Sequence, residues 1–321
     1  MDDVHLLDRH KDSYFESSRH RTALIESIST GAVPLKFAYA GSAAFTHDRY
    51  AETDSYADMM ASAAAESDTL LHSGLADLDL DEIAEVGPGN GRHSVAFLGQ
   101  LAARGRAPRR YLAMDFSQTL LGIAERRVRD GLGPRMRLDT EVWDVEECPT
   151  GHLERWRSGG SPVVVCLLGH TLGNLEDPNQ ALRHLADGLR TGDVLLASVL
   201  LRIPPGSEDS AMTAYRTDAF RSAVLEPLLA AGLDPSDLDL RIGYDDNAVV
   251  GEATLCRDAR VGGTELPRGH QIRCFLSRRF TGDEVVRLFS ESGWSIRAIR
   301  VDETGNHMTV VAARKQGSQC P

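Results

Sequence analysis

Short apolar runs and amphipathic stretches alternate along the chain from residue 83 to about residue 201. The apolar runs have the length of strands and fall at 83–86, 111–114, 136–142, 162–168 and 194–201. Amphipathic stretches long enough for helices lie between them, at 94–104, 117–130 and 177–189. The run 162–168 is rich in β-branched residues without polar alternation, so we expect it to be buried on both faces. This order of strands and helices predicts a parallel sheet covered by helices.

The pattern is different on either side of this central region. Residues 12–29 and 51–80 have helical spacing, and residues 207–232 predict a further helix. Strands joined by turns follow at 238–244, 249–256 and 271–277, and then come a helix with a capping box at 281–290 and strands at 297–301 and 308–313. We therefore expect an α/β domain made of residues 66–204 and 278–321. A second lobe would contain residues 1–65 and 205–277.

Composition narrows the choice of partners. The chain of 321 residues is 42% hydrophobic, which is enough for a sizeable core. Its 47 acidic and 35 basic side chains give a net charge of −12 without a basic cluster, which argues against nucleic acid as a partner. The apolar stretches are too short for a membrane span, and the start Met1-Asp2-Asp3 lacks the features of a signal peptide. We expect a cytoplasmic protein.

Cysteine and histidine spacing gives no sign of a metal site. The five cysteines are scattered without a CxxC pair, so we expect buried or incidental thiols in a reducing compartment. The eleven histidines form no HExxH pattern, so we expect no metal.

The first candidate site is the segment Glu85-Val-Gly87-Pro-Gly89-Asn-Gly91, between a predicted strand and a predicted helix. Glycines permit a tight turn and let backbone N–H groups come close to a ligand. Asp115 ends the next strand, where an acid can accept hydrogen bonds from both ribose hydroxyls of a nucleotide. Asp144 ends the third strand and could meet an adenine amino group. The alternatives are a helix cap for Asp115 and a solvated turn for Asp144.

The spacing of these residues allows either a nicotinamide dinucleotide or S-adenosylmethionine (SAM). Three features favour SAM. The glycine loop follows some 80 residues of helical sequence, it lacks the sixth-position glycine of dinucleotide sites, and Glu85 precedes it, as an acid commonly does in methyltransferases.

Two further segments point to a family. The stretch Leu168-Gly-His-Thr-Leu-Gly-Asn-Leu175 resembles the Gly-Ser-Thr-Ile-Gly-Asn segment of the histidine-specific methyltransferases, whose best-known activity is trimethylation of histidine in ergothioneine biosynthesis. The segment 34–45, with Pro34-Leu-Lys-Phe-Ala-Tyr39, Gly41-Ser42 and Phe45, is similar to another part of that family. The resemblance implies a class I methyltransferase with a Rossmann-like parallel sheet and an added substrate-binding lobe. It also implies SAM as cofactor, with S-adenosylhomocysteine as product, and a soluble small-molecule enzyme of secondary metabolism.

The resemblance assigns a role to each matching residue. The expected cofactor-binding set is Glu85, Gly87, Gly89, Gly91, His93, Asp115, Phe116, Asp144, Val145 and Gly169. The expected substrate-binding set is Tyr39, Tyr50, Asn174, Tyr215, Phe275 and Ser277. Tyr39 and Asn174 would orient the amino-acid head group during catalysis, and His170 could act as a base, because imidazole has an ordinary pKa of about 6.5.

The chain departs from the family pattern at three positions, of which Phe275 bears on the methyl acceptor. His93 stands where the family has Lys, His170 where it has Ser, and Phe275 where an acid reads the imidazole of histidine. An apolar ring cannot accept the imidazole proton, so we expect another amino acid, or an amino-acid-like amine, as the acceptor.

Other interpretations remain open at this point. The tyrosines and Phe275 could be core residues, Asn174 could cap the helix near residue 177, and His170 could be structural. The chain could also be a small-molecule O-methyltransferase, a nicotinamide-dependent oxidoreductase, or a binding protein without activity. The sequence indicates no oligomeric state.

Overall fold

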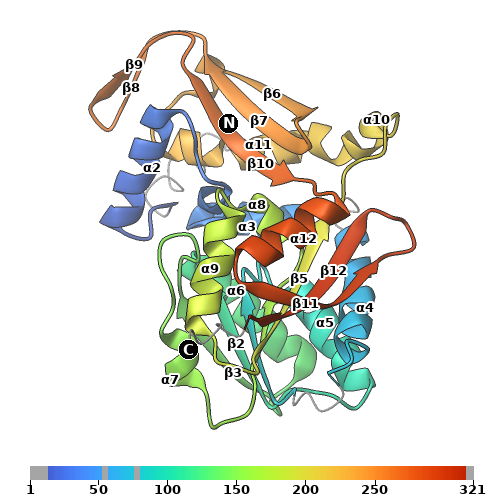
Figure 1. Ribbon diagram of the computed structural model, residues 1–321. Coiled ribbons are helices and arrows are strands. Elements are labelled where there is room, and N and C mark those ends of the chain that lie inside the picture. Colours follow the sequence, from blue (N-terminus) through green and yellow to red (C-terminus); the bar gives the residue numbers. More distant parts are fainter. Residues whose placement is uncertain (1–13, 53–56, 76–79, 316–321) are drawn as a thin grey trace, which may run out of the picture. The chain divides into compact units, whose positions relative to one another are not determined.

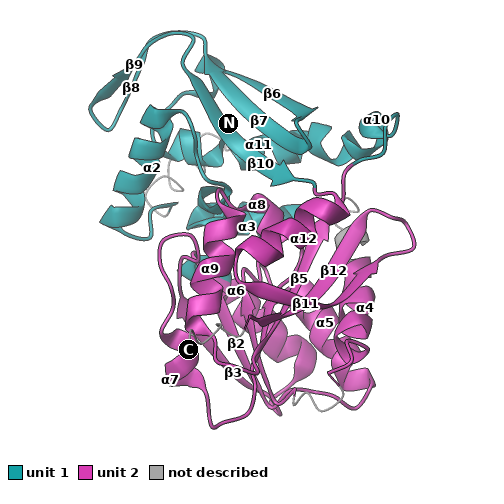
Figure 2. Ribbon diagram, in the orientation of Figure 1, with its two compact units in different colours: residues 1–56, 117–120, 203–279 teal, residues 57–116, 121–202, 280–321 magenta. Residues whose placement is uncertain are grey.

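The computed structural model describes residues 14–52, 57–75 and 80–315. Within it the chain divides into two compact units, drawn in two colours in Figure 2. Unit 1 contains residues 1–56, 117–120 and 203–279, and unit 2 contains residues 57–116, 121–202 and 280–321.

Unit 2 is built on a seven-stranded sheet (Figure 1). In chain order its strands are β1 (Glu82–Val86), β2 (Arg110–Asp115), β3 (Arg137–Val142), β4 (Val164–Leu167), β5 (Val194–Leu200), β11 (Trp294–Val301) and β12 (His307–Arg314). They lie side by side in the order β11-β12-β5-β4-β1-β2-β3. The five neighbouring strands from β5 to the edge strand β3 are parallel, whereas β12 runs antiparallel to both β5 and β11. The predicted α/β fold with a Rossmann-like parallel sheet is confirmed.

Helices cover both faces of this sheet because its strands are apolar on both sides. On one face α4 (Ala57–Leu71), α5 (Arg92–Ala103) and α6 (Gln118–Leu132) pack against Ile83 and Tyr111. On the other face α7 (His152–Trp156), α9 (Pro178–Gly188) and α12 (Gly282–Glu291) pack against Ala84, Val86 and neighbouring strands. The capping box predicted at Thr281 and Glu284 opens α12, as expected. Strand β4 is buried throughout, as its unalternated sequence predicts.

Unit 1 combines helices with a small antiparallel sheet. Its helical elements are α2 (Ser18–Thr30), η1 (Leu35–Tyr39), α3 (Ser42–Tyr50), α10 (Glu208–Ala211), η3 (Thr213–Arg216), α11 (Asp218–Ala230) and η4 (Pro235–Asp237). The sheet has the order β10-β7-β6, with β6 (Leu238–Asp245), β7 (Ala248–Leu255) and β10 (Gln271–Arg278). Asp246 and Asn247 join β6 to β7 with positive φ angles, as a two-residue hairpin requires.

Several parts of unit 1 differ from the predictions, and among them η1 and α3 lie outside every predicted helix. The helix expected over 207–232 is instead three elements, because the Thr217 hydroxyl accepts a hydrogen bond from the Phe220 N–H and starts α11 anew. The short hairpin of β8 (Ala259–Val261) and β9 (Thr264–Leu266) is absent from the predictions. It has too few residues to show the alternation by which strands are recognised.

Within the described residues, no helix has the length and apolar character needed to cross a membrane. The described cysteines are free thiols, of which Cys166 and Cys274 are buried. Cys320 lies outside the described residues.

Candidate functional site

The glycine loop joins β1 to α5 in unit 2 with a backbone that only glycine adopts easily. Gly87, Gly89 and Gly91 have φ angles of +70°, +58° and +80°. A Cβ atom at Gly87 would lie 2.8 Å from Cγ2 of Thr171, and one at Gly91 would lie 2.9 Å from Cα of Ala124. The loop is therefore packed closely against the following elements, and its bare backbone can approach a ligand.

The acids expected to bind the nucleotide follow the neighbouring strands. Asp115 ends β2 with 9% of its surface exposed, and Asp144 follows the end of β3. The carboxylate of Asp144 accepts a hydrogen bond from the Glu146 N–H at 3.0 Å. Since β1, β2 and β3 are adjacent and parallel, the glycine loop and both acids lie at the carboxyl ends of the strands, on the same side of the sheet. Ligands of open α/β sheets bind at the carboxyl ends of the strands.

Residues next to these acids complete the local structure. Ser117 provides the cap of α6, because its hydroxyl accepts a hydrogen bond from the Leu120 N–H at 3.1 Å. Phe116 follows Asp115 directly and is partly exposed. Val145 is buried beside Asp144, and its carbonyl oxygen lies 2.7 Å from Nδ1 of His184.

Glu85 is buried inside unit 2 rather than placed in the glycine loop itself. Its carboxylate accepts a hydrogen bond of 2.5 Å from the hydroxyl of Tyr111 on the adjacent strand. Burial raises the pKa of Glu85 above the ordinary glutamate value. This predicted cofactor ligand thus contacts the protein's own core.

His93, the residue in place of the family's lysine, contacts a second buried acid. Its Nε2 lies 2.5 Å from Oε2 of Glu66 on α4, and Oε1 of Glu66 lies 3.9 Å from Nε2 of His307 on β12. Burial alone would raise the pKa of Glu66, but the two imidazoles and hydrogen bonds from His93 and Ser198 outweigh it and lower this pKa. Burial lowers the pKa of His307 despite the nearby carboxylate. The arrangement is a buried, ionised carboxylate between two imidazoles.

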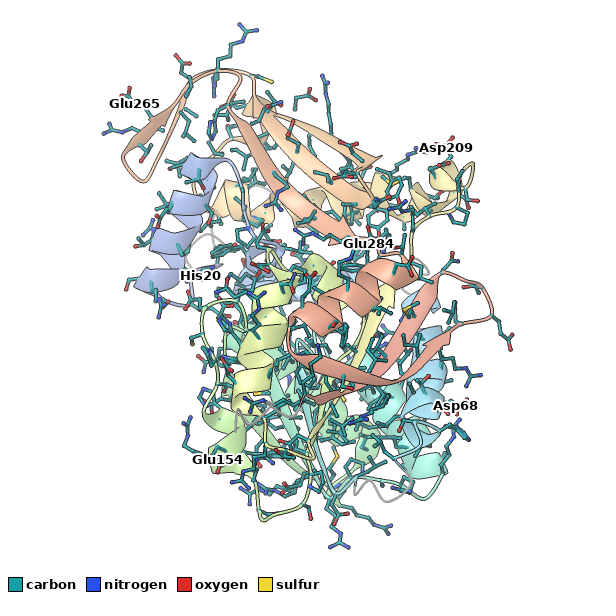
Figure 3. The ribbon with its side chains drawn as sticks, viewed as in Figure 1. His20, Asp68, Glu154, Asp209, Glu265 and Glu284 are labelled. Carbon is teal, nitrogen blue, oxygen red and sulfur yellow. The ribbon has the colours of Figure 1, made fainter. Side chains whose placement is uncertain are left out.

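Glu66 and His307 are absent from the residues predicted from the sequence. Asp68, two residues further along α4, shows why: it is partly exposed and pairs with Arg104 at the surface (Figure 3). Glu66 is fully buried, yet both acids stand in the same alanine-rich helix and look alike in the sequence. Only the packing of α4 against β12 and α5 makes Glu66 a buried acid and leaves Asp68 at the surface.

The family-like segment after β4 forms a tight turn and a short helix, α8 (Thr171–Asn174). Gly169 and His170 have φ angles of +58° and +69°, and such a backbone is uncommon for histidine. The rings of His170 and His307 are in edge contact, with centroids 4.8 Å apart. His170 therefore connects this turn to the Glu66 cluster.

Asn174 ends α8 with an unsatisfied group. Its Oδ1 is buried and has no hydrogen-bond partner among the residues that the structure describes. The cap of the next helix is Asp177, whose side chain accepts from the Gln180 N–H. The alternative interpretation of Asn174 as that cap is therefore excluded, and its oxygen is available to an N–H donor.

The remaining predicted residues belong to unit 1. Tyr39 ends η1, which is held by a hydrogen bond of 2.6 Å from the Tyr14 hydroxyl to the Phe37 carbonyl oxygen. The rings of Tyr39 and His47 are 4.5 Å apart, and burial lowers the pKa of His47 to about 4. This imidazole is neutral at physiological pH.

The other aromatic residues form one group, which we call the aromatic cluster: Tyr50, Tyr215, Phe220 and Phe275. Phe220 lies at its centre, with ring centroids 5.8, 5.1 and 4.8 Å from those of Tyr50, Tyr215 and Phe275. Burial raises the pKa of Tyr50 to about 12, and its hydroxyl donates to the Ala214 carbonyl oxygen. Phe275 fits because it pairs with Gly251, where a Cβ atom would lie 2.9 Å from the Phe275 Cβ. Ser277 is buried two residues further along β10.

A family model described as histidine-specific, SAM-dependent methyltransferase matches residues 44–314. The chain belongs to this family. It is a SAM-dependent methyltransferase, as the glycine loop and the residues 168–175 predict. No protein with curated annotation is similar enough in sequence to count as a match.

Solved methyltransferase structures match most of the chain, at low sequence identity and with TM-scores below 0.5. The magnesium protoporphyrin IX methyltransferase of Synechocystis PCC 6803, solved with S-adenosylhomocysteine, is 12% identical, with coverage of 86% of this chain and 96% of that one and a TM-score of 0.47. A SAM-dependent methyltransferase of Clostridium acetobutylicum is 12% identical, with coverage of 78% and 91% and a TM-score of 0.46. The SAM-bound amino pentose methyltransferase of Micromonospora echinaspora is 15% identical, with coverage of 84% and 94% and a TM-score of 0.39. The family assignment of this methyltransferase rests on its sequence match.

Proposed function

We propose that this methyltransferase transfers a methyl group from SAM to the nitrogen of a free amino acid, or of an amino-acid-like amine, other than histidine. The observation that carries this proposal is the buried Oδ1 of Asn174, which lacks a hydrogen-bond partner among the described residues. A buried amide oxygen left unpaired costs about 1–3 kcal/mol, and an N–H donor on the acceptor would satisfy it.

The proposed cofactor site lies in unit 2. The loop from Gly87 to Gly91 would hold the methionine part of SAM against its backbone, because side chains at these positions would collide with Thr171 or Ala124. Asp115 would accept hydrogen bonds from the ribose, and Asp144 with Val145 would meet the adenine. When bound, SAM supplies a methyl group already activated on a sulfonium.

The chain's own residues would then align the acceptor. An amine attacks only through its neutral lone pair, so its extra proton must leave first. Asn174 would orient the amine through an N–H bond and leave the lone pair free for in-line attack. His170 would accept the departing proton at an imidazole nitrogen. Tyr39, Tyr50 and Tyr215 of unit 1 would select the acceptor, which makes unit 1 the substrate-binding lobe.

One substitution supports an acceptor other than histidine. Phe275 stands where the family has an acid, and its ring centroid lies 4.8 Å from that of Phe220 in an apolar environment. It offers no acceptor for an imidazole N–H.

The proposal is tested with Asn174→Ala and labelled SAM. We expect loss of methyl transfer by about 100-fold, because the variant cannot orient the amine, while calorimetry shows SAM affinity within about twofold of wild type. Asn179→Ala is the matched control, since Asn179 is bonded to the Ser292 hydroxyl elsewhere in unit 2. Normal turnover by Asn174→Ala would contradict the head-group assignment. Asn174→Asp keeps an accepting oxygen and should retain more activity than the alanine variant.

A further inference from the structure

Arg279 is a buried cation for which the described residues of unit 1 supply no acid. It follows β10 and is 7% exposed, and its backbone N–H donates to the Asn247 carbonyl oxygen at 2.6 Å. Its Nη2 donates a hydrogen bond of 2.6 Å to the hydroxyl of Tyr215. Its Nη1 is buried without a hydrogen-bond partner, and no carboxylate of the described residues forms an ion pair with it.

Such a group is costly in a folded protein. A guanidinium keeps its charge at every ordinary pH, so it cannot escape the cost of burial by losing a proton. Buried charges are normally paired or fully hydrogen-bonded. A bound anion would supply both the missing opposite charge and the missing hydrogen-bond acceptor.

The polar groups around Arg279 are also donors. The Tyr215 hydroxyl accepts from Arg279, so its own hydrogen is available for a second bond. Tyr244 has a buried hydroxyl that lacks a partner among the described residues. Tyr244 and Ser277 both pair with Val249 in register, which places them at the end of the sheet where Arg279 follows β10. This end of the sheet therefore offers hydrogen-bond donors and a positive charge.

The aromatic cluster provides apolar surroundings for the Tyr215 side chain that contacts Arg279. The ring of Tyr215 lies 5.1 Å from that of Phe220 and 5.8 Å from that of Phe275. The hydroxyl bonded to Arg279 is thus carried by a ring packed in apolar surroundings. A charge-assisted hydrogen bond is stronger in such surroundings than in water, and a planar guanidinium matches the geometry of a carboxylate.

We propose that Arg279 and Tyr215 form a carboxylate subsite that binds the acidic group of the methyl acceptor. Nη1 of Arg279 and the Tyr215 O–H would donate to the carboxylate oxygens, and the aromatic cluster would contact the adjoining apolar part of the ligand. This subsite deepens the proposed function and rests on it, because it takes the acceptor to be an amino acid. The carboxylate could be the α-carboxylate or a second one on the side chain.

The experiment compares acids with their matched amides. Calorimetry in the presence of S-adenosylhomocysteine measures the binding of the common L-amino acids and of their α-amides, with aspartate against asparagine and glutamate against glutamine as the side-chain arm. We expect at least one acid to bind 10-fold or more tightly than its amide in the wild type. In Arg279→Gln this difference should fall below twofold. The arm that shows the difference identifies which carboxylate is bound.

Controls separate charge, folding and function. Arg241→Gln removes the same charge from an exposed position of β6 and should keep the full difference. Should Arg279→Gln fail to fold, Tyr215→Phe removes one donor and should lose part of the difference. Equal binding of acids and amides, binding of no acid, or a difference that survives in Arg279→Gln would each overturn the subsite. If acids bind selectively but no methyl group is transferred to an amine, the proposed function fails while the subsite stands.

Discussion

The two units each bury an arginine, but they surround it differently. In unit 2, Arg157 and Asp193 have side chains that are 2% and 1% exposed and form a paired contact, with Nη1 of Arg157 3.0 Å from Oδ1 of Asp193. The same carboxylate accepts from the Val163 N–H at 2.9 Å. In unit 1, Arg279 is almost as deeply buried, and its only side-chain partner among the described residues is the neutral hydroxyl of Tyr215.

This difference distinguishes a charge that belongs to the fold from one available to a ligand. Arg157 is paired with a carboxylate of the chain itself. Glu66 is likewise paired with groups of the chain, since it lies between His93 and His307. Arg279 is compensated in part only, and the oxygen of Asn174 is not compensated at all. An arginine without a carboxylate partner among the described residues is therefore a better candidate for ligand binding than a paired one.

The largest expected effect is the loss of stability when the Arg157–Asp193 pair in unit 2 is broken. Arg157→Ala should lower the free energy of unfolding by about 3–5 kcal/mol, because it leaves the Asp193 carboxylate buried without its cation. Arg279→Ala should lower it by about 1 kcal/mol or less, since the group removed is itself unsatisfied. Urea denaturation of the ligand-free variants measures both values. Equal losses would contradict the comparison.

The second expected effect is a dependence of the free energy of unfolding on pH that arises from His47 in unit 1. The pKa of His47 in unit 1 is lowered by burial to about 4, below its ordinary value of 6.5. The unfolded chain therefore binds the proton first as pH falls, and the fold loses stability between about pH 6.5 and pH 4. The full loss is about 3 kcal/mol for this shift. Denaturation of wild type and His47→Gln across this range measures it, and the variant should lack this part of the decline.

Glu66 in unit 2 provides the contrasting pH range. Its pKa lies below the ordinary glutamate value of 4.5, so the fold keeps this contribution above about that pH and loses it only in stronger acid. Glu66→Gln should therefore remove this part of the stability loss below pH 4.5. A change confined to the range above pH 4.5 would show that the carboxylate is not ionised as described.

A third expected effect concerns cofactor binding. Asp115→Ala should weaken SAM binding by about 100-fold, because a carboxylate that accepts two ribose hydroxyls is replaced by a methyl group. Arg279→Gln should leave SAM affinity within about twofold. Calorimetry with SAM checks both variants. An unchanged affinity in Asp115→Ala would refute the ribose assignment.

The sequence predicts the parts of the molecule whose pattern is local. The run at 162–168 becomes β4, the glycine loop adopts its positive φ angles, and Thr281 opens α12. Arg279, Glu66 and His307 could not be found in this way. Arg279 meets a residue 64 positions away, and Glu66 meets His93 27 positions away. A charged residue in a helix or after a strand looks exposed until distant segments pack around it.

The most direct test of the account is the position of a labelled methyl group. Purified enzyme is incubated with methyl-labelled SAM and the common amino acids, including histidine, together with N-hydroxylated and guanidino relatives, and products are identified by tandem mass spectrometry. We expect S-adenosylhomocysteine and a label on the nitrogen of an acceptor other than histidine. A label on oxygen, efficient methylation of histidine, or bound SAM without transfer to any acceptor would contradict it.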